Sequence, residues 1–244
     1  MIEPKALDLP NYGVLECDLD KEMIDYLWKL VHSYSPNVKW DGRRLIEFEN
    51  TDEKQFLLND DDKLFETEVL RPCVQSYFEN YGCPFKHKTT HLHELAFSRF
   101  WCRASTDGDY QSIHDHQGIF TFVVWLSIPF EGADERTVQA GFRPEASDFV
   151  LVYPDTCGQL QKRNFVLGKG AEGKMLFFPS DINHIVYPHY TTTEYRISLA
   201  GDVALCSMSP GQVLNPVSGK GKISGGLPQD CLLYTSDAAD EWCC

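Results

Sequence analysis

The chain of 244 residues lacks features that would assign it to several common classes. It has no apolar run of eighteen residues, so the sequence predicts no transmembrane helix. Its N-terminus lacks the basic start and the apolar stretch of a secretion signal. Basic residues are few, since 22 Lys and Arg stand against 36 Asp and Glu and give a formal net charge of −14. This balance argues against a nucleic-acid partner, because phosphate binding depends mainly on Lys and Arg.

Paired cysteines and the common nucleotide and hydrolase motifs are also missing. The chain has nine cysteines but no CxxC, which argues against a structural zinc site built from thiolates. Without a secretion signal, we expect free thiols in a reducing compartment. The sequence contains no GxSxG, GxxxxGK[ST] or GxGxxG, so no nucleophile elbow, phosphate loop or dinucleotide fold is predicted.

The first third of the chain has helical periodicity in two places. Residues 20–33 have apolar side chains at three- and four-residue steps, with Asp20 where an N-cap belongs. Residues 62–81 predict a second helix that Pro72 kinks or splits. The polar stretch 34–61 between them is expected to be mostly loop.

From residue 91 the sequence has the short apolar and aromatic runs that are typical of strands. The predicted strands are 95–103, 120–128, 149–153, 165–167, 175–178 and 195–200, and 120–128 is apolar enough for burial on both faces. Helices followed by many short strands favour a mainly β (α+β) fold, a jelly roll with N-terminal buttressing helices. We expect one domain over residues 1–204, in which residues 1–90 form a helical N-terminal region and residues 91–204 form the jelly-roll core.

The C-terminal region differs in composition from the rest of the chain. Residues 205–230 are rich in Gly, Ser and Pro and predict a flexible tail. Residues 231–244 resemble a translated sequencing-adapter read, and we interpret them as a non-native assembly artefact without function.

Three histidines form the strongest candidate site. His114 and His116 are two residues apart, and on a strand such a pair points to one face. His184 follows an apolar strand and a Pro-Ser turn. Imidazoles suit Fe, Zn, Cu and Ni, so the residues alone predict a metal site without choosing the metal.

A candidate anion-binding strand lies just downstream. Arg196 and Ser198 share one face of the predicted strand 195–200. A buried guanidinium is costly unless it meets an anion, and it binds a carboxylate through two parallel hydrogen bonds. The pair suits a dicarboxylate such as 2-oxoglutarate.

Two blocks carry a family resemblance. The run from Ile113 to Pro129 (IHDHQGIFTFVVWLSIP) and the run from Leu176 to Pro188 (LFFPSDINHIVYP), followed by EYRISLAG, resemble 2-oxoglutarate- and Fe(II)-dependent oxygenases of marine bacteriophages. The resemblance covers residues 12–204 and implies a double-stranded β-helix, Fe(II), and 2-oxoglutarate and O₂ as co-substrates. It names no substrate. We expect a cytoplasmic location, in the host cell if the source is viral, and no membrane partner.

The motif departs from the usual two-histidine, one-carboxylate triad, because position i+2 is His116. His114, His116 and His184 could form a three-histidine site. A bulge could instead turn Asp115 inward to replace one histidine, or Asp181 could supply the carboxylate.

The predicted function is oxidative decarboxylation of 2-oxoglutarate coupled to C–H oxidation, with hydroxylation as the default outcome. One alternative is a three-histidine, cupin-like iron dioxygenase that uses no 2-oxoglutarate and needs no Arg196. The other is a non-catalytic jelly roll, such as a phage structural or binding protein, with a poor metal site.

Overall fold

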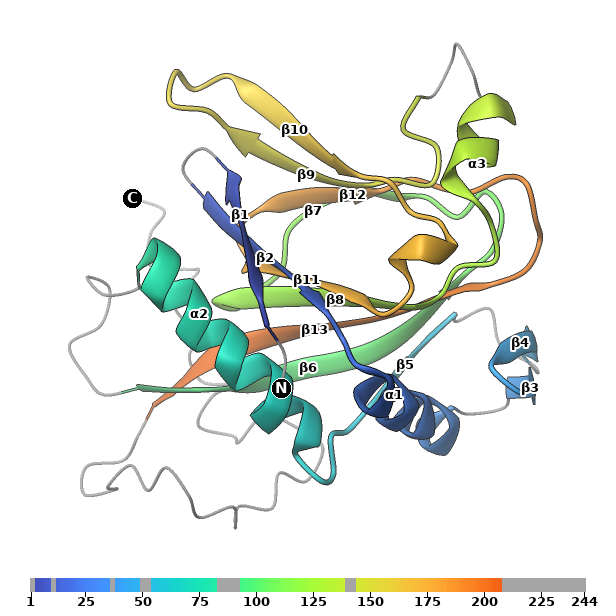
Figure 1. The fold of residues 1–244 in the computed structure, drawn as a ribbon, viewed down its shortest axis with the longest axis horizontal. Coiled ribbons are helices and arrows are strands. Elements are labelled where there is room, and N and C mark those ends of the chain that lie inside the picture. The colour runs from blue at the N-terminus through green and yellow to red at the C-terminus, as the bar shows by residue number, and fades with distance from the viewer. Residues whose placement is uncertain are drawn as a thin grey trace, which may run out of the picture.

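The computed structural model describes residues 3–9, 12–35, 38–48, 54–82, 93–138 and 144–207. Two antiparallel sheets face each other, and two helices cover the outer face of the larger one (Figure 1). This arrangement confirms the predicted mainly β jelly roll with N-terminal helices, the double-stranded β-helix.

The larger sheet has seven strands, and every neighbouring pair in it is antiparallel. Its spatial order is β1 (Lys5–Leu9), β2 (Tyr12–Asp18), β11 (Lys174–Pro179), β8 (Phe120–Ser127), β13 (Arg196–Ser207), β6 (His93–Ser105) and β5 (Gln55–Leu57). Strand β5 is thus an edge strand of this sheet.

The smaller sheet has four strands, also antiparallel. Its order is β10 (Leu160–Phe165), β9 (Phe149–Pro154), β12 (Asn183–Val186) and β7 (Gln111–His114). A separate hairpin pairs β3 (Val38–Asp41) with β4 (Arg44–Phe48).

The helices are α1 (Lys21–Tyr34), α2 (Arg71–Tyr81) and the short α3 (Gly132–Val138), with a π-helical turn Glu66–Leu70 before α2 and a 3₁₀ turn Lys169–Ala171. Helix α1 begins where predicted, and the Asp20 carboxylate accepts a hydrogen bond from Met23 N at 2.8 Å. Pro72 lies in the first turn of α2, directly after the π-helical turn, so the predicted second helix runs through residues 66–81 and changes from π-helical to α-helical geometry just before Pro72.

Two cores occupy the two faces of the larger sheet. Leu27, Phe65 and Phe122 belong to the core between the helices and the sheet, whereas Trp125 and Phe149 belong to the core between the sheets. Strand β8 is therefore buried on both faces, as its apolar run predicts.

Period-two alternation then decides which side chains of β13 face the second sheet. Ile197, Leu199 and Val203 belong to the helix-side core. The intervening Arg196 and Ser198 point between the sheets, toward the candidate site.

Several predictions for the chain before residue 93, and the predicted strand at residues 165–167, were wrong. Residues 34–61 contain β3, β4 and β5 rather than mostly loop, and β1 and β2 extend the larger sheet within the region expected to be helical. Of the predicted strand 165–167, only Phe165 lies in a strand, as the last residue of β10. Residues 208–244, which include almost all of the predicted tail and the whole suspected artefact, lie outside the described residues, and the domain boundaries stay a prediction.

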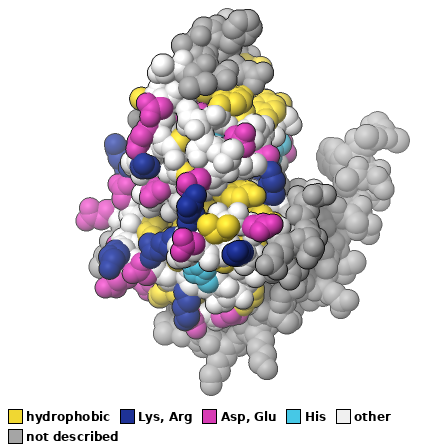
Figure 2. Space-filling view, turned by 90° about the vertical axis from the view of Figure 1, so that its right-hand side faces the viewer, with side chains coloured by type: hydrophobic (Ala, Val, Ile, Leu, Met, Phe, Trp, Pro, Cys, Tyr) yellow, Lys and Arg dark blue, Asp and Glu magenta, His cyan; other side chains and the backbone are white. Residues whose placement is uncertain are grey.

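None of the described helices is long and apolar enough to cross a membrane. On the face in Figure 2, the described Lys and Arg side chains are interspersed with Asp and Glu and form no continuous basic patch.

Candidate active site

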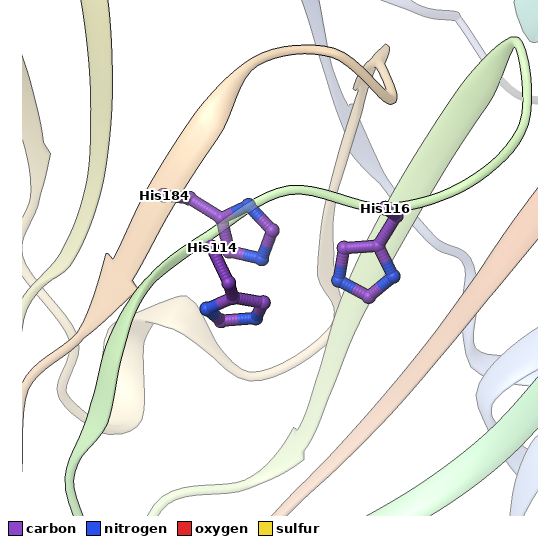
Figure 3. Close-up of side chains that lie close together, drawn as sticks. All are labelled: His114, His116 and His184. Atoms are coloured by element: carbon purple, nitrogen blue, oxygen red, sulfur yellow. The ribbon is translucent and has the colours of Figure 1, made fainter. Parts of the chain in front are cut away.

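The structure brings His114, His116 and His184 together between the sheets (Figure 3). One potential ligand atom from each lies within 4.8 Å of the others. The ring centroids of His114 and His184 are 4.2 Å apart, and those of His116 and His184 are 5.0 Å apart. The three side chains thus form a group that could hold a single metal ion.

The elements that carry them differ from the expected ones. His114 ends β7 and pairs in register with His184 on the neighbouring strand β12. His116 lies in the connection after β7, not on the strand, so the predicted i, i+2 strand geometry was wrong. Its backbone N–H donates to Ser180 O at 3.1 Å, which fastens the connection to the turn before β12.

A glycine allows this connection to pass close to β13. Gly118 has φ +141, and a Cβ there would lie 3.0 Å from Val203 O. Only glycine adopts such a conformation readily at so close an approach. The Gly of the His-Asp-His-Gln-Gly run is therefore needed to place His116 against the strand.

Each of the three rings has its Nδ1 near an oxygen acceptor. His114 Nδ1 lies 2.6 Å from Ser112 O, and His184 Nδ1 lies 3.3 Å from Ile182 O. Because a carbonyl oxygen only accepts, these contacts favour the tautomer with the proton on Nδ1, in which Nε2 can bind a metal ion. Burial, with the nearby His114 and His116 charges, lowers the pKa of His184 to about 3, so its ring stays neutral.

Asp202 orients the remaining ring, and sequence reasoning missed it. Its Oδ1 lies 3.1 Å from His116 Nδ1 and accepts a hydrogen bond from Thr121 Oγ1 at 2.9 Å. Ser180 Oγ completes the chain at 2.9 Å from Thr121 Oγ1. A carboxylate behind a histidine fixes the ring and raises its basicity as a ligand. The signal was present, because Asp202 continues the alternation that Arg196 and Ser198 begin.

The two candidate carboxylate ligands lie elsewhere. The side chains of Asp115 and Asp181 are both exposed. Among the described residues, the candidate metal-binding group consists of the three histidines and contains no carboxylate.

Arg196 lines the same pocket as the histidines and is 2% exposed. Its Nη1 has no hydrogen-bond partner among the described residues. Burial, together with the positive charge of Arg103, lowers the pKa of Arg196 to about 10, which still leaves it charged at neutral pH. Ser198 lines the pocket beside it. A buried charge with an unused donor requires an anion.

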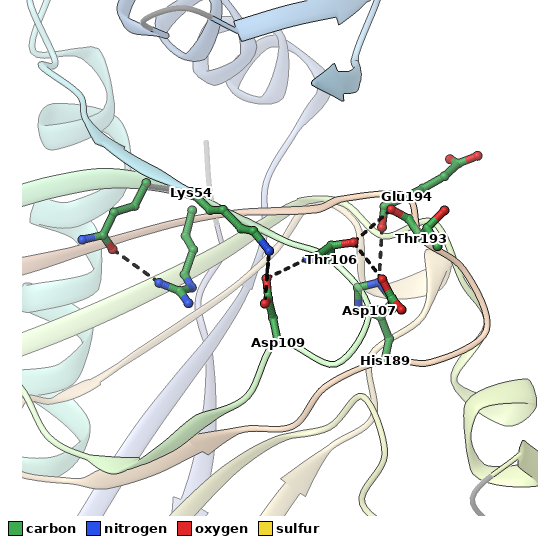
Figure 4. A network of polar contacts seen from close by, with 9 residues as sticks. Lys54, Thr106, Asp107, Asp109, His189, Thr193 and Glu194 are labelled. Atoms are coloured by element: carbon green, nitrogen blue, oxygen red, sulfur yellow. Dashed lines mark hydrogen bonds and ion pairs between the residues drawn. The ribbon is translucent and has the colours of Figure 1, made fainter. Parts of the chain in front are cut away.

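A polar network joins the end of β6 to the segment that leads into β13 (Figure 4). Thr106 Oγ1 donates to Thr193 O at 3.0 Å, and Thr106 N donates to Asp109 Oδ2 at 2.9 Å. Lys54 forms an ion pair with Asp109 at 3.0 Å. The end of β6 is thereby tied to the segment that leads into β13, which holds Arg196 in place.

The residues fit the groups that the sequence resemblance implies. Three imidazoles whose Nδ1 atoms face oxygen acceptors can offer Nε2 to a divalent first-row metal ion. The unpaired Arg196 Nη1 suits a carboxylate, and the pocket is also lined by the aromatic side chains of Trp101, Trp125, Phe149 and Phe178.

Comparison with solved structures gives distant resemblances. An oxidoreductase of the 2OG-Fe(II) oxygenase family from Burkholderia pseudomallei is 13% identical, covers 76% of this chain and 79% of its own, and has a TM-score of 0.45. A prolyl-4-hydroxylase from Pseudomonas putida is 14% identical, with coverages of 82% and 90% and a TM-score of 0.40. No curated protein sequence matches the chain.

A family model gives the decisive match. Residues 99–202 match the family described as "Putative 2OG-Fe(II) oxygenase", where 2OG is 2-oxoglutarate. Over residues 99–202 the chain is thus similar to 2OG-Fe(II) oxygenases. The matched segment contains the three histidines, Arg196 and Asp202. The predicted enzyme class and the co-substrates Fe(II), 2-oxoglutarate and O₂ are confirmed by this match, whereas the resemblance to bacteriophage proteins stays a prediction.

Proposed function

We propose that the protein is an Fe(II)- and 2-oxoglutarate-dependent hydroxylase. His114, His116 and His184 hold the metal through Nε2, and Arg196 with Ser198 binds the distal carboxylate of 2-oxoglutarate. The metal, 2-oxoglutarate and O₂ together supply an oxidant for a C–H bond, with succinate and CO₂ as co-products. Nucleic acid is not a partner in this proposal, given the net charge of −14.

One observation carries the proposal: the unpaired Nη1 of buried Arg196 lines the same pocket as the three-histidine group. An acidic co-substrate that spans from the histidines to Arg196 uses both features. Ser198, on the same face of β13, can donate a further hydrogen bond to the carboxylate.

The chain's own residues provide orientation and an enclosed site. Asp202 faces Nδ1 of His116 and the Ser112 carbonyl faces Nδ1 of His114, which leaves Nε2 of each ring available for the metal in this proposal. Aromatic side chains exclude water, which strengthens the electrostatic interactions of Arg196.

Anaerobic spectroscopy tests the proposal. Fe(II)-loaded protein should develop a weak visible absorption band when 2-oxoglutarate is added, since 2-oxoglutarate chelates the metal. Arg196→Gln should retain Fe(II) and require far more 2-oxoglutarate for the band, whereas Arg163→Gln on β10, which is exposed, should behave as wild type. A folded, metal-loaded wild-type sample without the band would refute the proposal.

The absence of a carboxylate from the described histidine group favours a second candidate, a three-histidine dioxygenase that binds its substrate directly to iron. That enzyme needs no anion at Arg196. Wild-type affinity for 2-oxoglutarate that is unchanged by Arg196→Gln would support it.

A further inference from the structure

Arg103 is a second cation in the pocket, and neither the metal nor 2-oxoglutarate accounts for it. It lies on β6 and lines the same pocket as Arg196 and the histidines. Its Nε is buried without a hydrogen-bond partner, and its Nη1 has a marginal contact of 3.5 Å with Gln55 Oε1. Burial lowers the pKa of Arg103.

No carboxylate among the described residues of the pocket neutralises this charge. The described residues that line it include Arg103 and Arg196 but no Asp or Glu. Asp109, the acidic group that acts on Arg103, is already paired with Lys54 at 3.0 Å. Once a distal carboxylate occupies Arg196, Arg103 still lacks an anion.

The strand register places Arg103 between the histidines and Arg196. Trp101, which stacks on His116 at 5.5 Å, pairs with Ala200. Arg103 pairs with Ser198, and Arg196 pairs with Ser105. Each two-residue step is about 7 Å along a strand. Arg103 is therefore one step closer to the metal-binding end than Arg196.

The register also places Arg103 next to the edge strand of the larger sheet. On β5, the strand that ends the larger sheet, Gln55 pairs with Arg103 and Leu57 pairs with Trp101. Leu57 is 70% exposed. Arg196, in contrast, is 2% exposed and lies one strand further in. Arg103 thus has an exposed apolar side chain, Leu57, on the neighbouring strand, whereas Arg196 lies deeper in the sheet.

We propose that Arg103 binds a carboxylate of the substrate to be oxidised, so that the substrate is a small carboxylic acid with an apolar body. The carboxylate forms charge-assisted hydrogen bonds with the guanidinium, and the apolar body contacts Leu57 and Trp101. This inference rests on the proposed function for the role of the metal and of Arg196, but the anion site at Arg103 is tested separately.

The experiment uses a pair of probes that differ in charge and share an apolar chain, hexanoate and hexanamide. Binding of each to Zn(II)-loaded protein saturated with 2-oxoglutarate is measured by ligand-observed NMR, with diamagnetic Zn(II) in place of Fe(II). Wild type should bind hexanoate at least tenfold more tightly than hexanamide. Arg103→Gln should weaken hexanoate binding by about tenfold or more and leave hexanamide unchanged. Arg163→Gln is the matched control, since its guanidinium lies outside the pocket.

The dissociation constant for 2-oxoglutarate is measured on the same variants. It should stay within threefold of wild type in Arg103→Gln. A tenfold rise would assign Arg103 to the co-substrate and overturn the inference, as would equal binding of the two probes or no binding of hexanoate to wild type. The probes are also titrated into Zn(II)-loaded protein without 2-oxoglutarate. If wild type fails to bind 2-oxoglutarate but Arg103 still discriminates the probes there, the proposed function fails and the anion site stands.

Discussion

Replacing Asp202 with Asn tests how the third imidazole is held. The wild-type carboxylate is 3% exposed, accepts from Thr121 Oγ1 and faces His116 Nδ1. Asparagine is nearly isosteric but neutral. If its amide N–H₂ turns toward His116, it favours the tautomer with the proton on Nε2, the atom that must bind the metal. Both the lost charge and the changed tautomer lower the affinity of the site for metal.

The expected magnitude follows from the role of a carboxylate behind a metal-binding histidine. Loss of such a partner weakens metal affinity by about 10- to 100-fold, or about 1.4–2.8 kcal/mol. The Thr121→Val variant removes the hydroxyl that bonds to Asp202 but keeps the carboxylate, so its effect should be smaller. Asp115→Asn, next to His116 but exposed, should leave the affinity within about threefold of wild type, since surface pairs contribute little.

The assay is a competition titration with a chromophoric chelator, carried out anaerobically with Fe(II). Circular dichroism of each variant establishes that it is folded. The reasoning is refuted if Asp202→Asn binds Fe(II) within threefold of wild type. A loss of tenfold or more in Asp115→Asn would instead point to the alternative in which Asp115 is the ligand.

Three further substitutions test co-substrate binding by Arg196, the backbone conformation at Gly118 and the stability of helix α1. Arg196→Gln should raise the dissociation constant of 2-oxoglutarate by about 10- to 100-fold, the value of a hydrogen bond to a charged group, with Fe(II) affinity unchanged in the same titrations. Gly118→Ala should lower the free energy of unfolding by about 1–3 kcal/mol in urea and weaken metal binding, because φ +141 and the Val203 carbonyl leave no room for a Cβ. Asp20→Ala should lower the free energy of unfolding by about 1 kcal/mol through loss of the hydrogen bond to Met23 N, with no change in metal affinity. A change in the free energy of metal binding larger than the change in the free energy of unfolding would contradict this assignment.

The hydrophobic pattern of the sequence predicted the elements that bury one face, such as a helix, or both faces, such as a central strand. Helix α1 follows its apolar periodicity from Asp20, and β8 follows the continuous apolar run from Phe120. Short strands with polar outer faces gave no such signal. Strand β5 has one buried side chain, Phe56, between two exposed ones, and three residues are too few to establish alternation.

The site was predicted only incompletely because its geometry depends on long-range contacts. The histidines and Arg196 are visible as motifs, and the structure gathers them. That His116 sits beyond the end of β7 depends on its bond to Ser180 and on the close passage of Gly118 past Val203, neither of which follows from spacing. Arg103 lies in a predicted strand, and the sequence does not show which strand pairs with it. Its place beside Ser198 follows only from the pairing of β6 with β13.

Strand β13 shows why the core and the site cannot vary independently. Ile197 and Leu199 are fully buried on the helix side, while Arg196 and Ser198 line the pocket on the other side. A slip of one residue in its pairing would exchange these two sets, placing a guanidinium in the apolar core. The free energy of burying the two aliphatic side chains therefore also fixes the position of Arg196, and the long pairing with β6 extends that constraint to Arg103. Strand packing thus holds both cations at set distances from the histidines before any ligand binds, which is the preorganisation that a site for two anions requires.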